Sequence, residues 1–349
     1  MWQQIALPHR WHYGTLRSGS KSATLLHADA NGLAVHRFIM PRFLSDEYVQ
    51  SLPSMPFWQA MLRDRELFPE IRNNAVTVYY RGAALIRDIR LKNGNFIGKT
   101  HVRYIPLRST DSVAVEFISS TLNGLNFSNA IEPWPLANAD QDVLAAYKQR
   151  MKLIGGAERN VIDSLCRHSG NVIVDQEMKF QTRGDQKPDK IDILAYSAVD
   201  STYCFVEVKS VTDSRLAMGS DGVREVVAQL RRYCDRIRAH AEDISQDIES
   251  TIKFKTSLGL GDRVAACHGV AATRILAKPI LAIGGCSDRD VRSILQRDGV
   301  WESMIDSLNE VAAGLILCGQ GGTRLDLADG RQRRWFDRGL LKLPGNSPA

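Results

Sequence analysis

Several features that define whole protein classes are missing from this chain of 349 residues. No apolar run reaches 18 residues, the minimum expected of a membrane-spanning helix. The first residues, MWQQIALPHRWHYG, lack the basic-then-apolar order of a signal peptide. There is no internal repeat and no low-complexity tract, and 44% hydrophobic and 24% charged residues are ordinary for a globular protein. We therefore expect a cytoplasmic globular protein that is not associated with a membrane.

Cysteine is present but in neither of its structural patterns. The six cysteines are spread out with no CxxC pair, and several lie within apolar runs. This spacing argues against a disulfide framework and a zinc site, and predicts reduced thiols in the core. The chain also lacks Walker A, GxGxxG, GxSxG and HExxH patterns, so neither ATP use nor the corresponding hydrolase chemistry is predicted.

The net charge is +6, and its distribution along the chain is uneven. Residues 1–139 contain 15 Lys+Arg and 10 Asp+Glu, whereas the rest of the chain contains 30 and 29. A basic excess in the N-terminal part suits a polyanionic partner, although many proteins are mildly basic.

A stretch with two prolines followed by Asn and Asp residues, NAIEPWPLANADQD (129–142), predicts a domain boundary. We place an N-terminal domain of unknown role, regulatory or nucleic-acid binding, at residues 1–139. A second domain follows at residues 140–349. The length of the chain is sufficient for two such domains.

The N-terminal domain is expected to mix strands and helices. Residues 74–107 predict strands with turns at Arg81-Gly82 and at Lys92-Asn93-Gly94. Residues 45–68 predict short helices broken by two prolines, Pro53 and Pro56.

In the second domain the pattern predicts an α/β (α+β) fold. The expected elements are a helix at 140–168 that the pair Gly155-Gly156 divides, strands at 171–180, 190–197 and 201–209, a helix at 221–240, a strand at 279–285, helices at 288–297 and 301–312, and a strand at 313–320. Three successive strands followed by alternating helices and strands predict a mixed sheet with helices on both faces.

Charged residues occur where two strands of this sheet should bury carbon. In KIDILAYSAVDSTYCFVEVKS, Asp192 begins one apolar run, and Glu207 and Lys209 end the next. Because side chains alternate along a strand, Glu207 and Lys209 share a face, and Asp192 on the neighbouring strand can lie beside Glu207. Two close carboxylates repel each other, and a divalent cation with a preference for oxygen, Mg²⁺ or Mn²⁺, relieves the repulsion. With Lys209 aimed at a phosphate, the pattern predicts phosphodiester hydrolysis.

The spacing D192-x14-E207-V-K209 resembles the signature of the PD-(D/E)XK nuclease superfamily, and the expected element order of residues 145–320 is similar to its restriction-endonuclease-like core. The resemblance implies Asp192, Glu207 and the Val208 backbone carbonyl as metal ligands and Lys209 as support for the nucleophile. It also implies Glu158, on the helix before the first strand, as a further catalytic acid near the metal.

The helix that follows the hairpin carries a second point of similarity. Gln229 and Tyr233 are four residues apart, hence neighbours on the helix surface, and this Q-x-x-x-Y resembles a motif of the RecB-type members, in which it positions substrate or the active-site lysine. The five arginines of this helix are candidates for phosphate contacts, but base rates favour a solvated face: Arg224, Arg231, Arg232, Arg236 and Arg238.

A fainter resemblance, to Shedu-like anti-phage nucleases, comes from the Q-x-x-x-Y helix followed by AKPILAIGG. Together these resemblances imply a Mg²⁺- or Mn²⁺-dependent endonuclease acting on DNA in defence against foreign DNA. Family members that cut two strands are often homo-oligomers, a dimer or higher. The alternative is a catalytically silent DNA-binding or sensor protein on the same fold, and a third hypothesis is a structural protein whose buried charges only fix the fold.

Three neighbouring patterns compete with this choice of residues. Asp189, in the literal Pro-Asp pair, is a rival for Asp192, but only Asp192 is followed directly by the apolar run. Two further [DE]-x-K triplets, Glu177–Lys179 and Asp185–Lys187, lack an acid at the start of a preceding strand.

Overall fold

The computed structural model of the protein describes residues 42–101, 104, 131–135, 141–154, 156–167, 172–180, 189–216, 224–270, 274–296, 300–319, 333–335 and 340–342. All of them lie in one compact unit, Arg37–Ala349. Within these residues, no helix combines the length and apolar character needed to cross a membrane. The six cysteines are all buried and free, which confirms the core thiols expected from their spacing.

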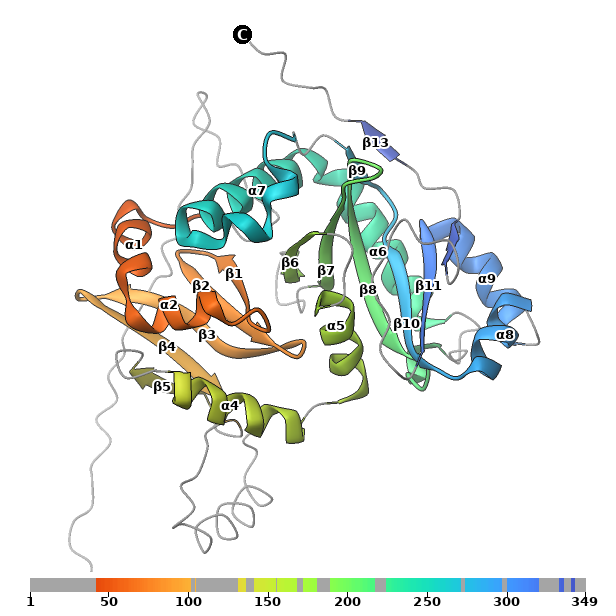
Figure 1. Ribbon diagram of the computed structural model, residues 1–349. Coiled ribbons are helices and arrows are strands. Elements are labelled where there is room, and N and C mark those ends of the chain that lie inside the picture. The colour runs from red at the N-terminus through yellow and green to blue at the C-terminus, as the bar shows by residue number, and fades with distance from the viewer. Residues whose placement is uncertain are drawn as a thin grey trace, which may run out of the picture. The chain divides into compact units, whose positions relative to one another are not determined.

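The first sheet is a five-stranded antiparallel meander in the order β1-β2-β3-β4-β5 (Figure 1). Its strands are β1 (Phe68–Arg72), β2 (Ala75–Tyr80), β3 (Ala83–Lys92), β4 (Asn95–His101) and β5 (Ile131–Pro135). The two predicted turns join β2 to β3 and β3 to β4. Both place a non-glycine residue and then a glycine at positive φ, Arg81-Gly82 and Asn93-Gly94, the conformation of tight hairpin turns.

The predicted short helices pack on this sheet. They are α1 (Asp46–Ser51), the 3₁₀ turn η1 (Leu52–Ser54) and α2 (Pro56–Arg63). Pro53 and Pro56 lie in the first turns of η1 and α2, where a missing backbone N–H costs nothing.

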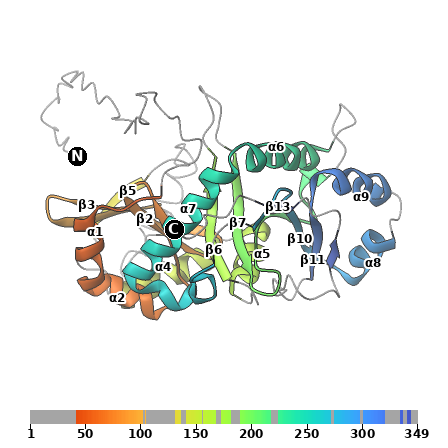
Figure 2. The ribbon, with the colours of Figure 1, turned by 90° about the horizontal axis from the view of Figure 1, so that it is seen from above.

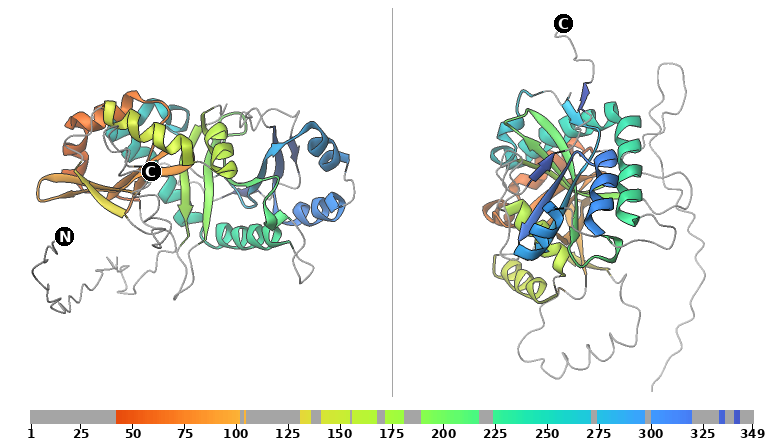
Figure 3. Two further views of the ribbon diagram at one scale, coloured as in Figure 1. Left: turned by 90° about the horizontal axis from the view of Figure 1, so that it is seen from below. Right: turned by 90° about the vertical axis from the view of Figure 1, so that its right-hand side faces the viewer.

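Elements that follow the predicted boundary complete the core of the first sheet. Helix α4 (Gln141–Ile154) contributes Leu144, Tyr147 and Met151 to that core and lies along the sheet in Figure 3. The Trp58 indole N–H donates to the Leu258 carbonyl at 2.9 Å. The core of the first sheet thus contains residues from both sides of the predicted boundary. The division between residues 139 and 140 stays a prediction.

The second sheet is mixed, as expected, with the order β12-β11-β10-β8-β7-β6. Its strands are β6 (Val172–Lys179), β7 (Lys190–Ser197), β8 (Thr202–Ser210), β10 (Ile280–Cys286), β11 (Gly314–Gly319) and β12 (Arg333–Trp335), with β9 (Arg274–Leu276) and β13 (Leu340–Lys342) attached beside β8. Strands β6, β7 and β8 are antiparallel to one another, strands β8, β10 and β11 are parallel to one another, and β12 is antiparallel to β11. Strand β8 is therefore central, and all nine of its residues are buried.

Helices cover both faces of this sheet, which confirms the predicted fold class. The remaining helical elements are α5 (Ala157–Arg167), α6 (Glu225–Ala239), α7 (Ala241–Lys255), α8 (Asp288–Gln296), α9 (Val300–Val311) and the short turns η6 (Ser214–Leu216), η7 (Thr256–Leu260), η8 (Gly261–Arg263) and η9 (Ala265–Cys267). Helices α6 and α9 lie side by side on one face and α5 on the other (Figures 2 and 3). The glycine pair predicted to divide the first helix lies between α4 and α5. Helix α7 and strands β1, β5, β9, β12 and β13 were not predicted.

Two glycines allow α5 to lie close to its neighbours. A Cβ on Gly284 of β10 would overlap the Val161 side chain of α5. On the other side of α5, a Cβ on Gly82 would lie 2.9 Å from the Arg159 carbonyl oxygen. Helix α5 is thus held between the two sheets, and this contact fixes the position of its first turn, which contains Glu158.

Candidate functional site

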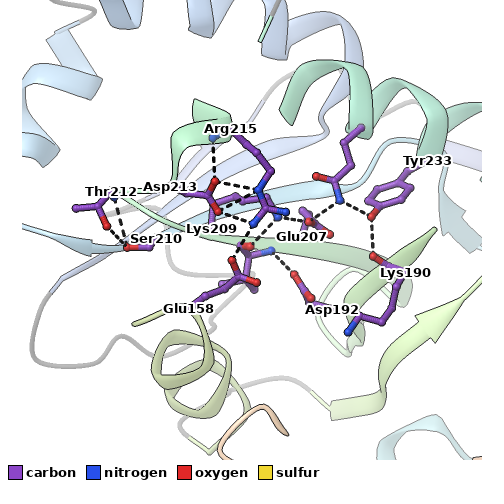
Figure 4. Close-up of polar contacts among 12 residues, drawn as sticks. Glu158, Lys190, Asp192, Glu207, Lys209, Ser210, Thr212, Asp213, Arg215 and Tyr233 are labelled. Carbon is purple, nitrogen blue, oxygen red and sulfur yellow. Dashed lines mark hydrogen bonds and ion pairs between the residues drawn. The ribbon is translucent and has the colours of Figure 1, made fainter. Parts of the chain in front are cut away.

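The charged residues of the predicted hairpin converge at the adjoining ends of β7 and β8 (Figure 4). Ile193 pairs with Val206, so Asp192 and Glu207 occupy the next positions along the two strands. Glu207 and Lys209 alternate with Val206 and Val208, which pack with α5 on the other face. The shared face of the two charged residues, inferred from strand periodicity, therefore lies on the α6 side of the sheet.

Asp192 is buried, with 7% of its surface exposed. Its carboxylate accepts a 2.9 Å hydrogen bond from the Val208 backbone N–H. Burial raises the pKa of Asp192 to about 6, although the Lys209 charge and the Val208 hydrogen bond oppose the rise. The carboxylate is therefore costly to ionise in this position without a further cation.

Glu207 and Lys209 form a buried ion pair, with 2% and 1% of their surfaces exposed. Lys209 Nζ also donates to the Val208 carbonyl at 3.0 Å. Burial first, and then the charge of Asp192, raise the pKa of Glu207 to about 8, against the lowering effect of Lys209. Glu207 Oε2 is buried and has no hydrogen-bond partner among the described residues. A buried oxygen that accepts no hydrogen bond destabilises the fold, because it has lost its contacts with water and gained none in return.

The Q-x-x-x-Y pair of α6 holds this arrangement in place. Gln229 Nε2 donates to Glu207 Oε1 at 2.9 Å and lies 2.6 Å from the Tyr233 hydroxyl. The hydroxyl in turn donates to the Lys190 carbonyl at the start of β7, at 2.6 Å. Burial, as the largest cause, raises the pKa of Tyr233. The pair therefore positions Glu207 and ties α6 to β7; its contact is with Glu207 and not with Lys209.

Glu158 reaches the site from α5, on the opposite face of the sheet. It is half-buried and forms a 3.1 Å ion pair with Arg215, which also binds Asp213 through two nitrogens (Figure 4). The charge of Glu158 contributes to the raised pKa values of both Asp192 and Glu207. Arg215 and Asp213 were not singled out in the sequence, because they follow β8 in a turn that shows no motif.

The competing patterns have other partners. The Asp189 carboxylate forms ion pairs with Arg236 at 2.9 Å and with Arg232 at 3.6 Å. Glu177 pairs with Lys190 at 2.5 Å. The Asp185–Lys187 triplet and its neighbour Pro188 lie outside the described residues.

None of the five arginines of the helix region 224–238 lines the cleft described next, so that candidate role is not supported. Arg224 is buried and donates to the Leu216 carbonyl, and the exposed Arg231 pairs with Glu310 at 2.9 Å. Together with the contacts of Arg232 and Arg236 to Asp189, these bonds explain four of the arginines as structural or surface groups.

The site opens into a cleft of about 760 Å³. Its lining includes Asp192, Glu207 and Lys209 together with residues of the first sheet, which the sequence did not predict. The basic residues of the lining are Arg42, Arg72, Arg87, Arg90, Arg159, Lys179, Lys190, Lys209 and Arg215. They outnumber the six acids of the lining: Asp88, Glu158, Glu177, Asp189, Asp192 and Glu207. The cleft is therefore a basic surface around a small acidic centre.

The donor set fits a hard divalent cation better than zinc. Within the described part of the chain, no group of three or more His, Cys, Asp or Glu side chains is arranged to hold a metal ion. The available ligands are the two carboxylates and the Val208 carbonyl, all of them oxygen. The unpartnered Glu207 Oε2 and the raised pKa values of both acids are features that a bound cation would relieve.

Comparison with known proteins adds no identification: no family model, curated protein or solved structure matches the chain.

Proposed function

We propose that this protein is a Mg²⁺- or Mn²⁺-dependent nuclease that hydrolyses phosphodiester bonds of DNA. One observation carries the proposal: two raised-pKa carboxylates, Asp192 and Glu207, lie at the ends of adjacent central strands beside the buried Lys209, within a basic cleft. Perturbed acids of this kind concentrate at functional sites. The resemblance of these residues to the PD-(D/E)XK signature supports the same conclusion.

Asp192, Glu207 and the Val208 carbonyl are the groups that would hold the cation, with Glu158 as a nearby acid. The chemistry that such a cation supplies to phosphodiester hydrolysis when bound is a lowered pKa of water and compensation of charge on the phosphate. Gln229 fixes the direction of Glu207 by its 2.9 Å hydrogen bond. Lys209 contributes a donor next to Glu207, where it can orient water or stabilise negative charge on a phosphate oxygen.

The setting implied by the Shedu-like resemblance is defence against foreign DNA, with the protein acting as a homo-oligomer in the cytoplasm. These points are part of the proposal. The defence setting is supported by the sequence pattern AKPILAIGG after the Q-x-x-x-Y helix, and the homo-oligomer by analogy with family members that cut two strands.

The test is cleavage of supercoiled, linear and single-stranded DNA, and of RNA, in Mg²⁺ or Mn²⁺ and in EDTA. We expect cation-dependent cleavage of DNA and a loss of about 10²- to 10³-fold in Glu207→Gln and in Lys209→Met. The exposed pair Arg231–Glu310 supplies the matched controls, Arg231→Met and Glu310→Gln, which should cleave like the parent.

Two outcomes contradict the assignment. Cleavage that persists in both Glu207→Gln and Lys209→Met would place the chemistry elsewhere. DNA binding without any cation-dependent cleavage by the parent would instead favour the silent DNA-binding or sensor protein. Thermal unfolding of each variant separates a lost activity from a lost fold.

A further inference from the structure

Four cations of the cleft lining have no ion-pair partner among the described residues, and all four are exposed. One of them, Arg159 of α5, donates to the Tyr104 hydroxyl at 3.3 Å. The other three lie on strands, Arg87 and Arg90 on β3 and Lys179 on β6. Other cations of the lining are neutralised locally: Arg42 and Arg72 by Asp175, Lys190 by Glu177, Lys209 by Glu207, and Arg215 by Asp213 and Glu158. The unpaired charge of the cleft thus lies partly on the N-terminal sheet.

A β-bulge brings the two arginines to the same side. Residues three apart on a regular strand point to opposite faces. Between Arg87 and Arg90 the pairing with β4 shifts by one residue, from Arg87–Lys99 to Arg90–Ile97, and Asp88 takes a φ of +50°. The Asp88 N–H lies 3.4 Å from the Thr77 hydroxyl of β2.

The bulge places the backbone of Asp88 in an unfavourable conformation. A left-handed φ at a residue other than glycine costs about 1–3 kcal/mol, although Asp tolerates it better than most. In return, both arginines line the cleft while Ile89 between them stays buried. Bulges commonly redirect side chains next to functional sites.

Lys179 pairs with Lys190 across β6 and β7, and Lys190 lies two residues before Asp192 on β7. Partial burial lowers the pKa of Lys179, and Glu177 opposes this effect. The charges of Arg72, Lys190 and Arg87 lower it further. Cations that disfavour one another's charge in this way are stabilised by an anion placed among them.

We propose that Arg87, Arg90 and Lys179 form a strip that binds backbone phosphates of the DNA and guides it to Asp192 and Glu207. The inference rests on the proposed function, because DNA is the substrate named there. Guanidinium groups suit phosphate oxygens because their N–H donors can bind two oxygens at once. The strip would give affinity without sequence preference, since it carries charges and not a base-reading surface.

The test measures binding apart from catalysis. Fluorescence anisotropy of a labelled DNA duplex in EDTA compares the parent with the triple variant Arg87→Gln, Arg90→Gln, Lys179→Gln across about 50 to 200 mM salt. Each phosphate contact contributes about 0.9 to the slope of log affinity against log salt, so the triple variant should lose about 2.7. Over this salt range, the affinity of the parent should fall about 40-fold more than that of the variant.

The matched control is a triple change of exposed cations outside the cleft: Lys253→Gln, Arg289→Gln, Arg292→Gln. It removes the same net charge and should keep the parent slope. The three single cleft variants are measured as well, each with an expected slope change of about 0.9, so that the test does not depend on the triple variant folding.

An unchanged slope in the cleft variants, or an equal loss in the control, overturns the strip. The strip is also overturned if the parent binds no DNA, or if the parent binds RNA and not DNA. If the parent cleaves but the cleft variants bind normally, the strip is wrong and the nuclease proposal stands. If the strip binds DNA but no cleavage occurs, the strip is supported and the nuclease proposal fails.

Discussion

Gln229 of α6 donates a 2.9 Å hydrogen bond to Glu207 of β8, so a helix side chain sets the direction of a strand carboxylate. The same amide lies 2.6 Å from the Tyr233 hydroxyl, which is anchored on the Lys190 carbonyl. One acid of the candidate site is therefore oriented by a chain of hydrogen bonds that begins on the neighbouring strand β7.

Replacing this amide should weaken cation binding without removing a ligand. In Gln229→Leu, Glu207 keeps its carboxyl group but loses its orienting donor, and loss of such a partner typically costs about 10- to 100-fold in metal affinity. Calorimetric titration with Mg²⁺ measures the change. Gln246→Leu, at an exposed position of α7, is the control and should bind Mg²⁺ like the parent. Equal affinities for Gln229→Leu and the parent would contradict a positioning role.

Mg²⁺ should raise the thermal stability of the parent, and EDTA should reverse the effect. A ligand that binds only the folded state at about 100 times its Kd stabilises by about 2.7 kcal/mol. Asp192→Asn and Glu207→Gln should each lose this gain, because each removes one of the two carboxylates. Differential scanning calorimetry is the measurement, with Glu310→Gln as the exposed control. A gain that survives in both site variants would place the cation elsewhere.

Asp175 should stabilise the fold in a pH-dependent way. Its carboxylate binds Arg72 at 2.9 Å and Arg42 at 2.5 Å. Burial alone would raise the pKa of Asp175, but these two arginines hold it below its ordinary value. A lowered folded pKa gives stability that is present above the unfolded pKa, near 4, and is lost as pH falls through the folded value.

Asp175→Asn should therefore be destabilised by about 3–5 kcal/mol at neutral pH, since two arginines lose a buried partner. The difference from the parent should shrink as pH falls below about 4. Urea unfolding at several pH values measures it, and Asp262→Asn, at an exposed position, is the control. A difference that does not change with pH would contradict the role of the ionised carboxylate.

The close approach of α5 to β10 should be sensitive to one methyl group. In Gly284→Ala the new Cβ overlaps the Val161 side chain, and overpacking of this kind costs about 1–3 kcal/mol. Because Glu158 lies one turn before Val161, the shift of α5 should also reduce cleavage. Val161→Ala in the same chain should restore part of both losses.

The matched control for this change is Gly156→Ala, where a Cβ would meet nothing within 4 Å. Chemical denaturation of the four proteins provides the comparison. A Gly284→Ala variant as stable as Gly156→Ala would show that the helix has room to move.

The sequence by itself determined the features that depend on local periodicity. Alternation along a strand placed Glu207 and Lys209 together, and the position of Asp192 before an apolar run placed it on the next strand. Helical spacing made neighbours of Gln229 and Tyr233. The glycine turns of the first sheet followed in the same way, because each depends on residues a few positions apart.

Tertiary structure alone decided which distant elements meet. Glu158 and Arg215 are 57 residues apart in the sequence. They meet because α5 packs on one face of the sheet and Arg215 lies in the turn that follows β8. Helix α4 was assigned to the second domain but packs on the first sheet. No local pattern records these choices, because they depend on the packing of whole elements against each other.

The strip of Arg87, Arg90 and Lys179 shows the same division between what local sequence predicts and what tertiary structure decides. At a spacing of three, Arg87 and Arg90 are expected on opposite faces of a strand, and only the bulge at Asp88 brings both to the cleft. A bulge depends on the register between two strands and on the Thr77 contact across them. The sequence thus specified the acids and the lysine of the site, and the pairing of strands in space decided which cations surround them.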